Sequence, residues 1–287
     1  MDRQKQSDSP NFAKSLQAKF DKISTMSYIA VKNLKLMEKF QVKTRLRLMM
    51  ASYTMSSKRS LHYKKKLESL NLLHFAAYTK SLTVFKEVAK FEFSLNPSDD
   101  YGITPLHIAA NLGVEKICNF ILSNSENLNL NAECLKGFTP FHLAAEEEHV
   151  QICNLIIKAF KKDNNPAEKN GRTPLHIAAY FGYLTTCKLI IEETNYASPA
   201  SSLYLGLTPF HLAAINGNTE VCKYFLDTFG DCEQWTDEKG RRAIHFAAMS
   251  GDFEKFEEIS EYFHEKNPRD FNGFTAKHLA ERFCNEQ

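Results

Sequence analysis

A short motif built around a histidine recurs seven times along this chain, and its spacing constrains the fold more than any other feature. The histidines follow one another at intervals of 33, 35, 34, 35, 34 and 33 residues. A period of this length predicts small structural units that stack on their neighbours, because one unit alone cannot bury its apolar face. The copies, numbered one to seven below, are LLHFAA (72–77), TPLHIAA (104–110), TPFHLAA (139–145), TPLHIAA (173–179), TPFHLAA (208–214), RAIHFAA (242–248) and TAKHLAE (275–281), with His74, His107, His142, His176, His211, His245 and His278.

The motifs of repeats two to five have the features of a helix start. A threonine side chain can cap the first turn, and the proline that follows takes the first helical position, where a missing N–H costs nothing. The paired alanines allow neighbouring helices to approach closely, and a glycine then ends the helix. The threonines are Thr104, Thr139, Thr173 and Thr208, and the glycines are Gly113, Gly182, Gly217 and Gly251.

A second helix is predicted after each motif. Positions 11 and 14 after the histidine are apolar in repeats one to six, and a three-residue step on one helical face indicates a buried stripe. A turn glycine precedes each following motif. The apolar pairs are Phe85/Val88, Cys118/Ile121, Cys153/Ile156, Cys187/Ile190, Cys222/Phe225 and Phe256/Ile259, and the turn glycines are Gly102, Gly137, Gly171, Gly206, Gly240 and Gly273.

The period and the Thr-Pro-Leu-His-x-Ala pattern resemble the ankyrin repeat over residues 70–287. The resemblance implies an all-α solenoid of stacked helix–turn–helix units with β-turn or hairpin loops, about six repeats being complete and the seventh truncated. It also implies a non-catalytic scaffold or adaptor that binds a partner protein through its concave face. The fold itself does not name that partner, because ankyrin stacks serve many roles.

In the family, the concave face is built from the turn tips and the outer face of the first helix. Carried onto this sequence, it comprises positions seven, six and four before each histidine and four and five after it. Apolar side chains gather there in the central repeats, and exposed apolar patches and aromatic anchors mark interaction sites. Alternatively, these side chains cover one another, or the loop 192–205 covers them. The predicted partner-binding residues are Tyr101, Ile103, Leu135, Phe138, Tyr180, Phe181, Tyr204, Leu207, Ile215 and Met249.

The repeat also argues for structural roles of the histidines and cysteines. Equivalent residues in stacked layers lie roughly 8–10 Å apart, which is too far for the ~2 Å bonds of one zinc ion. We therefore expect the histidines to hydrogen-bond between layers, and the cysteines of one repeat position to form a buried column without disulfides. The column comprises Cys118, Cys153, Cys187 and Cys222, whereas Cys134, Cys232 and Cys284 are placed in turns or at the terminus, where a reactive thiol is the less favoured interpretation.

Enzyme motifs are missing from the sequence. It contains no phosphate-binding P-loop, no Gly-x-Gly-x-x-Gly, no His-Glu-x-x-His and no Gly-x-Ser-x-Gly. The run Glu146-Glu147-Glu148 is interpreted as a solvated helix end. We expect no enzymatic activity, no cofactor, no metal and no small-molecule substrate. An unrecognised active site would require ionisable groups that converge in a pocket.

Charge divides the chain into a basic N-terminal segment, residues 1–66 with a net charge of +12, and a repeat domain, residues 67–287 with −10. Apolar residues at three- and four-residue steps, as in 12–23 and 42–49, indicate short basic amphipathic helices in the first segment. A partly disordered leader is the other interpretation. The segment is expected to cap the first repeat, to contact acidic membrane or nucleic acid weakly, or to act as a localisation tag. It can also fold back onto the acidic repeats.

The outer repeats depart from the motif, because Asn71-Leu72 and Arg242-Ala243 stand where Thr-Pro is expected. A lost cap costs about 1 kcal/mol, so these repeats should fray first. The chain ends inside the first helix of repeat seven, which either caps the stack or marks a fragment of a longer array. The alternative function is therefore a targeting arm of a larger channel, kinase or ubiquitin-ligase adaptor whose effector domain lies beyond residue 287. Without a membrane-spanning stretch or a secretory signal, we expect an intracellular protein of the cytoplasm or the nucleus.

Overall fold

The computed structural model describes residues 72–90, 92, 94–125, 128–160, 165–194 and 205–284. Every regular element within these ranges is a helix, with one isolated bridge between Arg269 and Thr275. The all-α prediction is therefore confirmed. The predicted basic segment 1–66 and its boundary at residue 67 lie outside the described residues. The chain forms two compact units, residues 1–125 and 126–287, which we describe separately.

In the first unit, two helix pairs correspond to repeats one and two. Helices α4 (Leu72–Tyr78) and α5 (Leu82–Ala89) form the first pair, and α6 (Pro105–Asn111) and α7 (Glu115–Asn124) form the second. Helix α4 packs on α6, and α5 packs on α7. The two first helices are therefore neighbours, as the repeat predicts.

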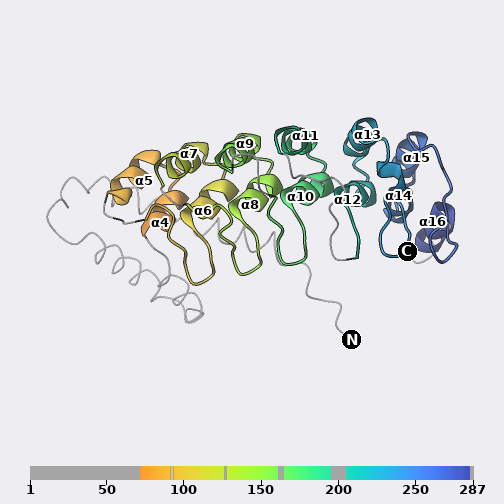
Figure 1. Ribbon diagram of the computed structural model, residues 1–287, viewed down its shortest axis with the longest axis horizontal. Coiled ribbons are helices and arrows are strands. Elements are labelled where there is room, and N and C mark those ends of the chain that lie inside the picture. The colour runs from red at the N-terminus through yellow and green to blue at the C-terminus, as the bar shows by residue number, and fades with distance from the viewer. Residues whose placement is uncertain are drawn as a thin grey trace. The chain divides into compact units, whose positions relative to one another are not determined.

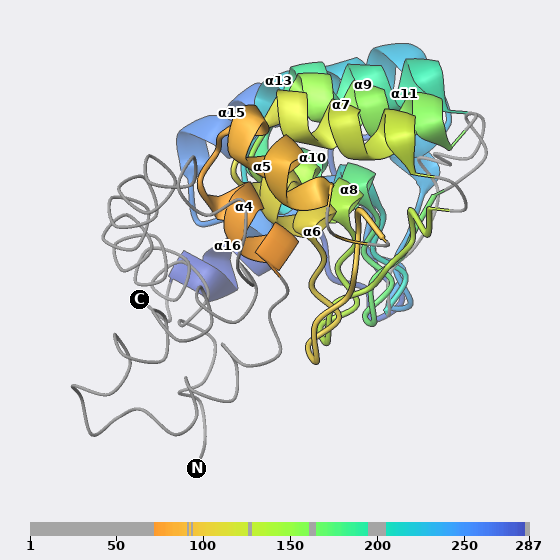
Figure 2. The same ribbon diagram turned by 90° about the vertical axis from the view of Figure 1, so that its left-hand side faces the viewer.

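The second unit contains repeats three to seven. Its first helices lie side by side in one layer, its second helices form another layer, and the turn loops extend away from the first-helix layer (Figures 1 and 2). The first helices are α8 (Pro140–Glu146), α10 (Pro174–Phe181), α12 (Pro209–Ile215), α14 (Ala243–Met249) and α16 (Ala276–Cys284). The second helices are α9 (Val150–Ala159), α11 (Leu184–Glu193), α13 (Thr219–Thr228) and α15 (Phe253–Glu261).

The predicted threonine caps are confirmed, and the motif histidine completes each of them. In repeat five the Thr208 backbone N–H donates to His211 Nδ1 over 3.0 Å, while the His211 backbone N–H donates back to the Thr208 hydroxyl over 3.4 Å. Because Nδ1 accepts a hydrogen bond, the neutral ring carries its proton on Nε2. The same arrangement starts α6 and α10, and at α8 the Thr139 N–H donates to His142 Nδ1 over 3.1 Å.

In repeats one, three, four, five and six, the Nε2 atom of the motif histidine bonds to the following repeat. His142 Nε2 donates to the Arg172 carbonyl over 2.9 Å, and His211 Nε2 donates to the Trp235 carbonyl over 3.1 Å. The histidine rings are fully buried, so each bond satisfies a polar atom that has no access to water. The predicted hydrogen bonds between layers are thus confirmed. The equivalent pairs are His74 with Ile103, His176 with Leu207, and His245 with Phe274.

The second helices bury the predicted apolar stripe. Ten of its twelve side chains are buried, and the other two, Val88 and Phe256, are half-buried. The four cysteines of the stripe are fully buried and form no disulfides, as expected. Burial raises the pKa of Cys118, Cys153 and Cys187 to about 12. These thiols therefore act as small apolar side chains.

The expectation for one of the remaining cysteines is wrong. Cys232 lies in a short 3₁₀ helix, η2 (Cys232–Gln234), rather than in a turn, and its side chain is fully buried. Burial, together with Asp231 and Glu233, raises its pKa to about 12, which disfavours the reactive thiolate. Cys134 does lie in a turn and is half-buried. The side chain of Cys284 lies outside the described residues.

Acidic side chains shape several loop tips, a feature that the motif analysis missed. Eight residues before the histidine, Asp237 is buried and accepts the backbone N–H groups of Lys239 and Arg241 over 2.9 and 2.8 Å. Its second oxygen pairs with the Arg241 guanidinium over 2.6 Å. Gly240, in the same turn, has a φ of +74°, which glycine adopts without strain. Asp99 and Asp270 hold two further tips through equivalent bonds.

Substitution of Asp237 by alanine should therefore lower stability. The change leaves two N–H groups without an acceptor and removes the partner of a guanidinium, for which we expect a loss of about 2–3 kcal/mol in the free energy of unfolding. Urea unfolding followed by circular dichroism measures this loss. The neighbouring Glu238→Ala change affects an exposed side chain and should cost less than about 0.5 kcal/mol. Equal losses in the two variants would contradict the role assigned to Asp237.

Candidate protein-binding face

The loop tips and the ends of the first helices in the second unit form one surface, which we call the loop face. It comprises those described residues of repeats three to seven that stand seven, six and four positions before each histidine and four and five after it. Equivalent positions in consecutive repeats lie side by side. Asn216 Nδ2, at the end of α12, donates to the Tyr180 carbonyl of α10 over 2.7 Å, and Asn218 Nδ2 donates to the same carbonyl over 2.7 Å.

An aromatic cluster occupies the end of α10. The ring centroids of Tyr180 and Phe181 are 5.2 Å apart in an edge-to-face arrangement, and Phe181 stacks on Tyr183 at 5.6 Å. Tyr180 and Phe181 remain exposed, Phe181 by 43% of its surface, although each is packed on one side by its neighbour. Such a cluster holds large apolar side chains in fixed positions at the surface, so little conformational entropy would be lost if a ligand covered them.

Carboxylates lie beside this cluster, at the end of α8. Glu146 is half-buried, and burial and the neighbouring Glu147 raise its pKa. The pKa of the Tyr183 hydroxyl is raised by burial and then by Glu148, Glu147 and Glu146, which places all three carboxylates near that hydroxyl. The end of α8 is therefore an acidic border of the aromatic cluster.

The loop tips add aliphatic side chains to the loop face. Leu135 is 61% exposed, and Leu205 is 44% exposed in a loop where its φ is +78°. A β-carbon makes that left-handed backbone unfavourable by about 1 kcal/mol or more. The fold thus holds a large apolar side chain in water on a strained backbone, which is typical of a functional position.

Phe138 and Arg172 form a packed pair on the tips of repeats three and four. The Arg172 guanidinium lies 5.5 Å from the centre of the Phe138 ring, and its Nε donates to Glu168 over 3.1 Å. Hydrogen bonds and the charge of Arg172 outweigh burial and lower the pKa of Glu168. The charge of Arg172 is thus held by Glu168 and the aromatic ring.

The predicted partner-binding residues fall into four groups. Leu135, Tyr180 and Phe181 are exposed on the loop face. Tyr204 lies outside the described residues, and Tyr101 and Ile103 belong to the first unit, where both are half-buried. The other four are half-buried in the second unit. They are Phe138, Leu207, Ile215 and Met249.

Two exposed aromatic residues of repeat seven were not predicted as partner-binding residues. Phe271 is 77% exposed, and Phe274 is also exposed. They stand seven and four positions before His278, so the offsets used for the other repeats would have found them. The Phe271 N–H donates to the Lys239 carbonyl over 2.9 Å, and its ring covers Gly240, where it leaves no room for a side chain. Phe271 therefore has a defined position despite its exposure.

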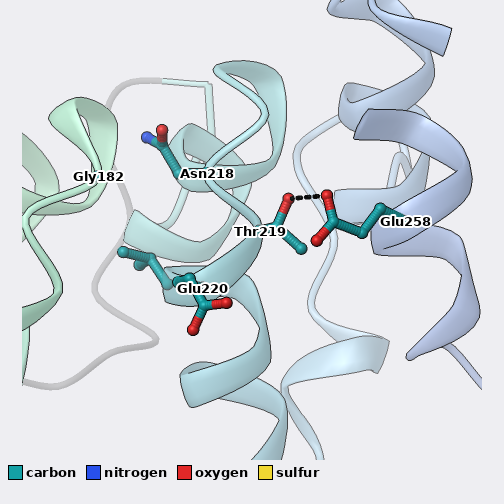
Figure 3. A pocket seen from close by; sticks show the side chains of 6 residues that line it. Gly182, Asn218, Thr219, Glu220 and Glu258 are labelled. Atoms are coloured by element: carbon teal, nitrogen blue, oxygen red, sulfur yellow. Dashed lines mark hydrogen bonds between the residues drawn. The ribbon is translucent and has the colours of Figure 1, made fainter. Parts of the chain in front are cut away.

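An open hollow of about 330 Å³ lies elsewhere in the second unit, lined by Gly182, Asn218, Thr219, Glu220, Val221 and Glu258 (Figure 3). Its polar groups already join the repeats, because Asn218 Nδ2 donates to two carbonyls of α10 and the Thr219 hydroxyl donates to Glu258 over 3.1 Å. Across the described residues, no three His, Cys, Asp or Glu side chains are grouped to hold a metal ion. The described lining of the hollow therefore holds no group of three possible metal ligands.

Comparisons with known proteins agree with this architecture. A family model described as ankyrin repeats (3 copies) matches residues 48–132, 126–202, 193–270 and 210–286. The crystal structure of the human ASB11 ankyrin repeat domain is similar with a TM-score of 0.62 and 18% sequence identity, over 76% of this chain and 98% of that one. The comparison with curated proteins gives no match. Within the described ranges, no helix has both the length and the apolar character needed to cross a bilayer.

Proposed function

We propose that this chain, which belongs to the ankyrin-repeat family, is a non-catalytic scaffold that holds a partner protein on its loop face. Ankyrin repeats generally mediate protein–protein interaction, and the loop face has the composition that such a role requires. The observation that carries the proposal is the exposure of Leu135, Tyr180, Phe181 and Leu205 on one surface of the second unit. Exposed aliphatic and aromatic side chains at repeated positions favour a protein partner over a small polar ligand.

The packing of these residues supports a binding role over a structural one. A side chain that serves the core of a repeat is buried, as the Phe210 side chain of α12 is. Phe181 and Leu205 instead keep more than two fifths of their surface in water. Burial of such side chains under a partner releases about 25 cal/mol per Å² of apolar area, and central aromatic anchors can each contribute 2 kcal/mol or more.

A double substitution of exposed residues tests the proposal. The full chain and its Phe181→Ser/Leu205→Ser variant are used for quantitative affinity capture from cells, and the captured proteins are compared. We expect at least one protein to bind the unchanged chain directly and to lose roughly 100-fold or more in affinity for the variant, because two anchors are removed. Thermal unfolding should change by only a few degrees, because both side chains are exposed.

The matched control is Phe253→Ser. This side chain is 66% exposed at the start of α15, in the second-helix layer rather than on the loop face. The control should keep the partner. If the double variant retains the same captured proteins at unchanged affinity, the loop face is not the binding surface. If it unfolds at a much lower temperature, Phe181 and Leu205 are structural residues and the proposal fails.

A further inference from the structure

The arrangement of charges on the loop face indicates the chemistry of its partner. Helices α8 and α10 pack side by side, and Glu146 and Glu147 occupy the same two repeat positions as Tyr180 and Phe181. The acidic end of one helix therefore lies directly beside the aromatic end of the next. A ligand group that covers the aromatic cluster also meets these carboxylates.

The carboxylates have few basic neighbours to neutralise them. Glu147 and Glu148 are exposed, and neither forms an ion pair with another residue that the structure describes. Lys136 and Arg172 are the cations near Glu146, and Arg172 is already held by Glu168. Like charges at adjacent positions repel one another, and none of the ion pairs between described residues involves Glu147 or Glu148. The negative potential beside the cluster is therefore available to a ligand.

Aromatic rings and carboxylates together favour one kind of side chain. The face of an aromatic ring attracts cations, and a guanidinium stacks on such rings better than an ammonium does. A carboxylate beside the ring supplies the opposite charge and can accept two parallel hydrogen bonds from a guanidinium. Leu135 and Leu205, on the tips of the same face, require apolar side chains instead.

From this juxtaposition we infer that the partner is a protein segment with both basic and aliphatic side chains, whose arginine or lysine docks on the Tyr180–Phe181–Tyr183 cluster against Glu147 and Glu148. The inference rests on the proposed function and specifies the partner of the same surface. The aliphatic residues of the segment cover the leucines of the loop tips. Because both carboxylates are exposed, the charge contribution is screened by salt within about 10 Å at 0.1 M.

Peptide selection against the full chain tests this partner chemistry. A phage library of random 12-residue peptides is selected on the unchanged chain and on the variant Glu147→Lys/Glu148→Lys. Peptides selected on the unchanged chain should be enriched in arginine or lysine together with leucine, isoleucine or valine. Synthetic copies of these peptides should lose about tenfold or more in affinity for the variant, because two attractive pairs become repulsive. Their affinity for the unchanged chain should also fall as NaCl is raised.

A variant with the same change of net charge separates local pairing from general attraction. Glu257→Lys/Glu261→Lys reverses two exposed carboxylates of α15, away from the loop face, and should bind the selected peptides nearly unchanged. Equal losses in the two charge variants would overturn the inference.

The outcomes also distinguish the inference from the proposed function. Uncharged or acidic peptides that still require Phe181 and Leu205 would overturn the inference and leave the proposed function intact. Selected peptides that bind the Phe181→Ser/Leu205→Ser variant as tightly as the unchanged chain would overturn both. Basic peptides that require Phe181 and Leu205, and that lose affinity when the charges of Glu147 and Glu148 are reversed, support both the inference and the proposed function.

Discussion

A fall in pH from 7.5 to 5 is expected to remove about 4 kcal/mol from the free energy of unfolding, through two buried histidines of the repeat motif. Burial lowers the pKa of His142 and of His211 from 6.5 to about 4, because a charged imidazolium is poorly solvated in the core. Nδ1 already accepts a backbone N–H in each ring, so a second proton also breaks a helix cap. Acid thus acts directly on the bonds that define the repeat.

The direction follows from the two protonation states. Below pH 6.5 the unfolded chain binds protons at both histidines, whereas the folded chain does not until the pH nears 4. Stability is therefore complete above about pH 7, falls between pH 6.5 and 4, and changes little from this source at lower pH. At pH 5 each histidine lowers the free energy of unfolding by about 2 kcal/mol relative to pH 7.5. Glu168 and Glu233, whose pKa values are lowered from 4.5, add losses mainly below pH 5.

Urea unfolding at pH 7.5, 6 and 5 measures the loss. In His211→Gln the side chain can still form a hydrogen bond but cannot take up a proton. The variant should be less stable than the unchanged chain at pH 7.5, but the loss between pH 7.5 and 5 should shrink by about 2 kcal/mol. Ile156→Val lowers stability by about 1 kcal/mol without removing a titrating group, and should keep the full pH dependence. A pH dependence that is the same in His211→Gln would exclude this histidine as its source.

Most of the architecture could be predicted from the sequence, because the repeat places each residue type in a fixed environment. The Thr-Pro starts, the histidine bonds between repeats and the cysteine column all follow from a single spacing. The acidic residues of the loop tips escaped notice because the same position holds Cys134 and Glu168 in repeats three and four. Backbone N–H groups at a turn need a hydrogen-bond acceptor, and different side chains provide it. The repeat position therefore does not hold the same residue type in every repeat.

The loop face was harder to predict than the core. Offsets from the histidine identify which positions belong to it, but exposure depends on neighbours in the adjacent repeat. Ile215 and Leu207 are half-buried, whereas Leu205, two positions before Leu207, is exposed. Leu205 also adopts a positive φ, which no sequence rule predicts for leucine. Which side chains of the loop face are exposed therefore depends on how one repeat packs on the next, which the sequence offsets do not specify.

The same dependence on neighbours makes Phe210 the most consequential core residue that we identify. Its ring is fully buried. The ring centroid lies 5.9 Å from that of Phe225, in its own repeat, and 5.9 Å from that of Phe263, in the next one. The chain of rings continues from Phe225 to Phe229 at 6.0 Å and from Phe229 to Trp235 at 6.2 Å. Phe210 thus joins repeats five and six through an aromatic cluster that ends at the single tryptophan of the protein.

Substitution of Phe210 by alanine should cost about 3–5 kcal/mol and should weaken the connection between these repeats. Because stability in repeat proteins is approximately a sum of repeat and interface contributions, the last repeats should then unfold separately. Trp235 fluorescence reports on them, and circular dichroism reports on all helices. We expect the fluorescence change to occur at a lower urea concentration than the dichroism change in this variant.

Phe141→Ala is the matched comparison, since Phe141 is buried and precedes His142 as Phe210 precedes His211. The same side chain is lost at the same repeat position, two repeats before Phe210, in the first repeat of the second unit. A similar total loss of stability is expected, but the fluorescence of Trp235 should not change before the dichroism does. If the two signals coincide in Phe210→Ala as well, the second unit unfolds as one block, and the aromatic cluster is not the connection that limits its cooperativity.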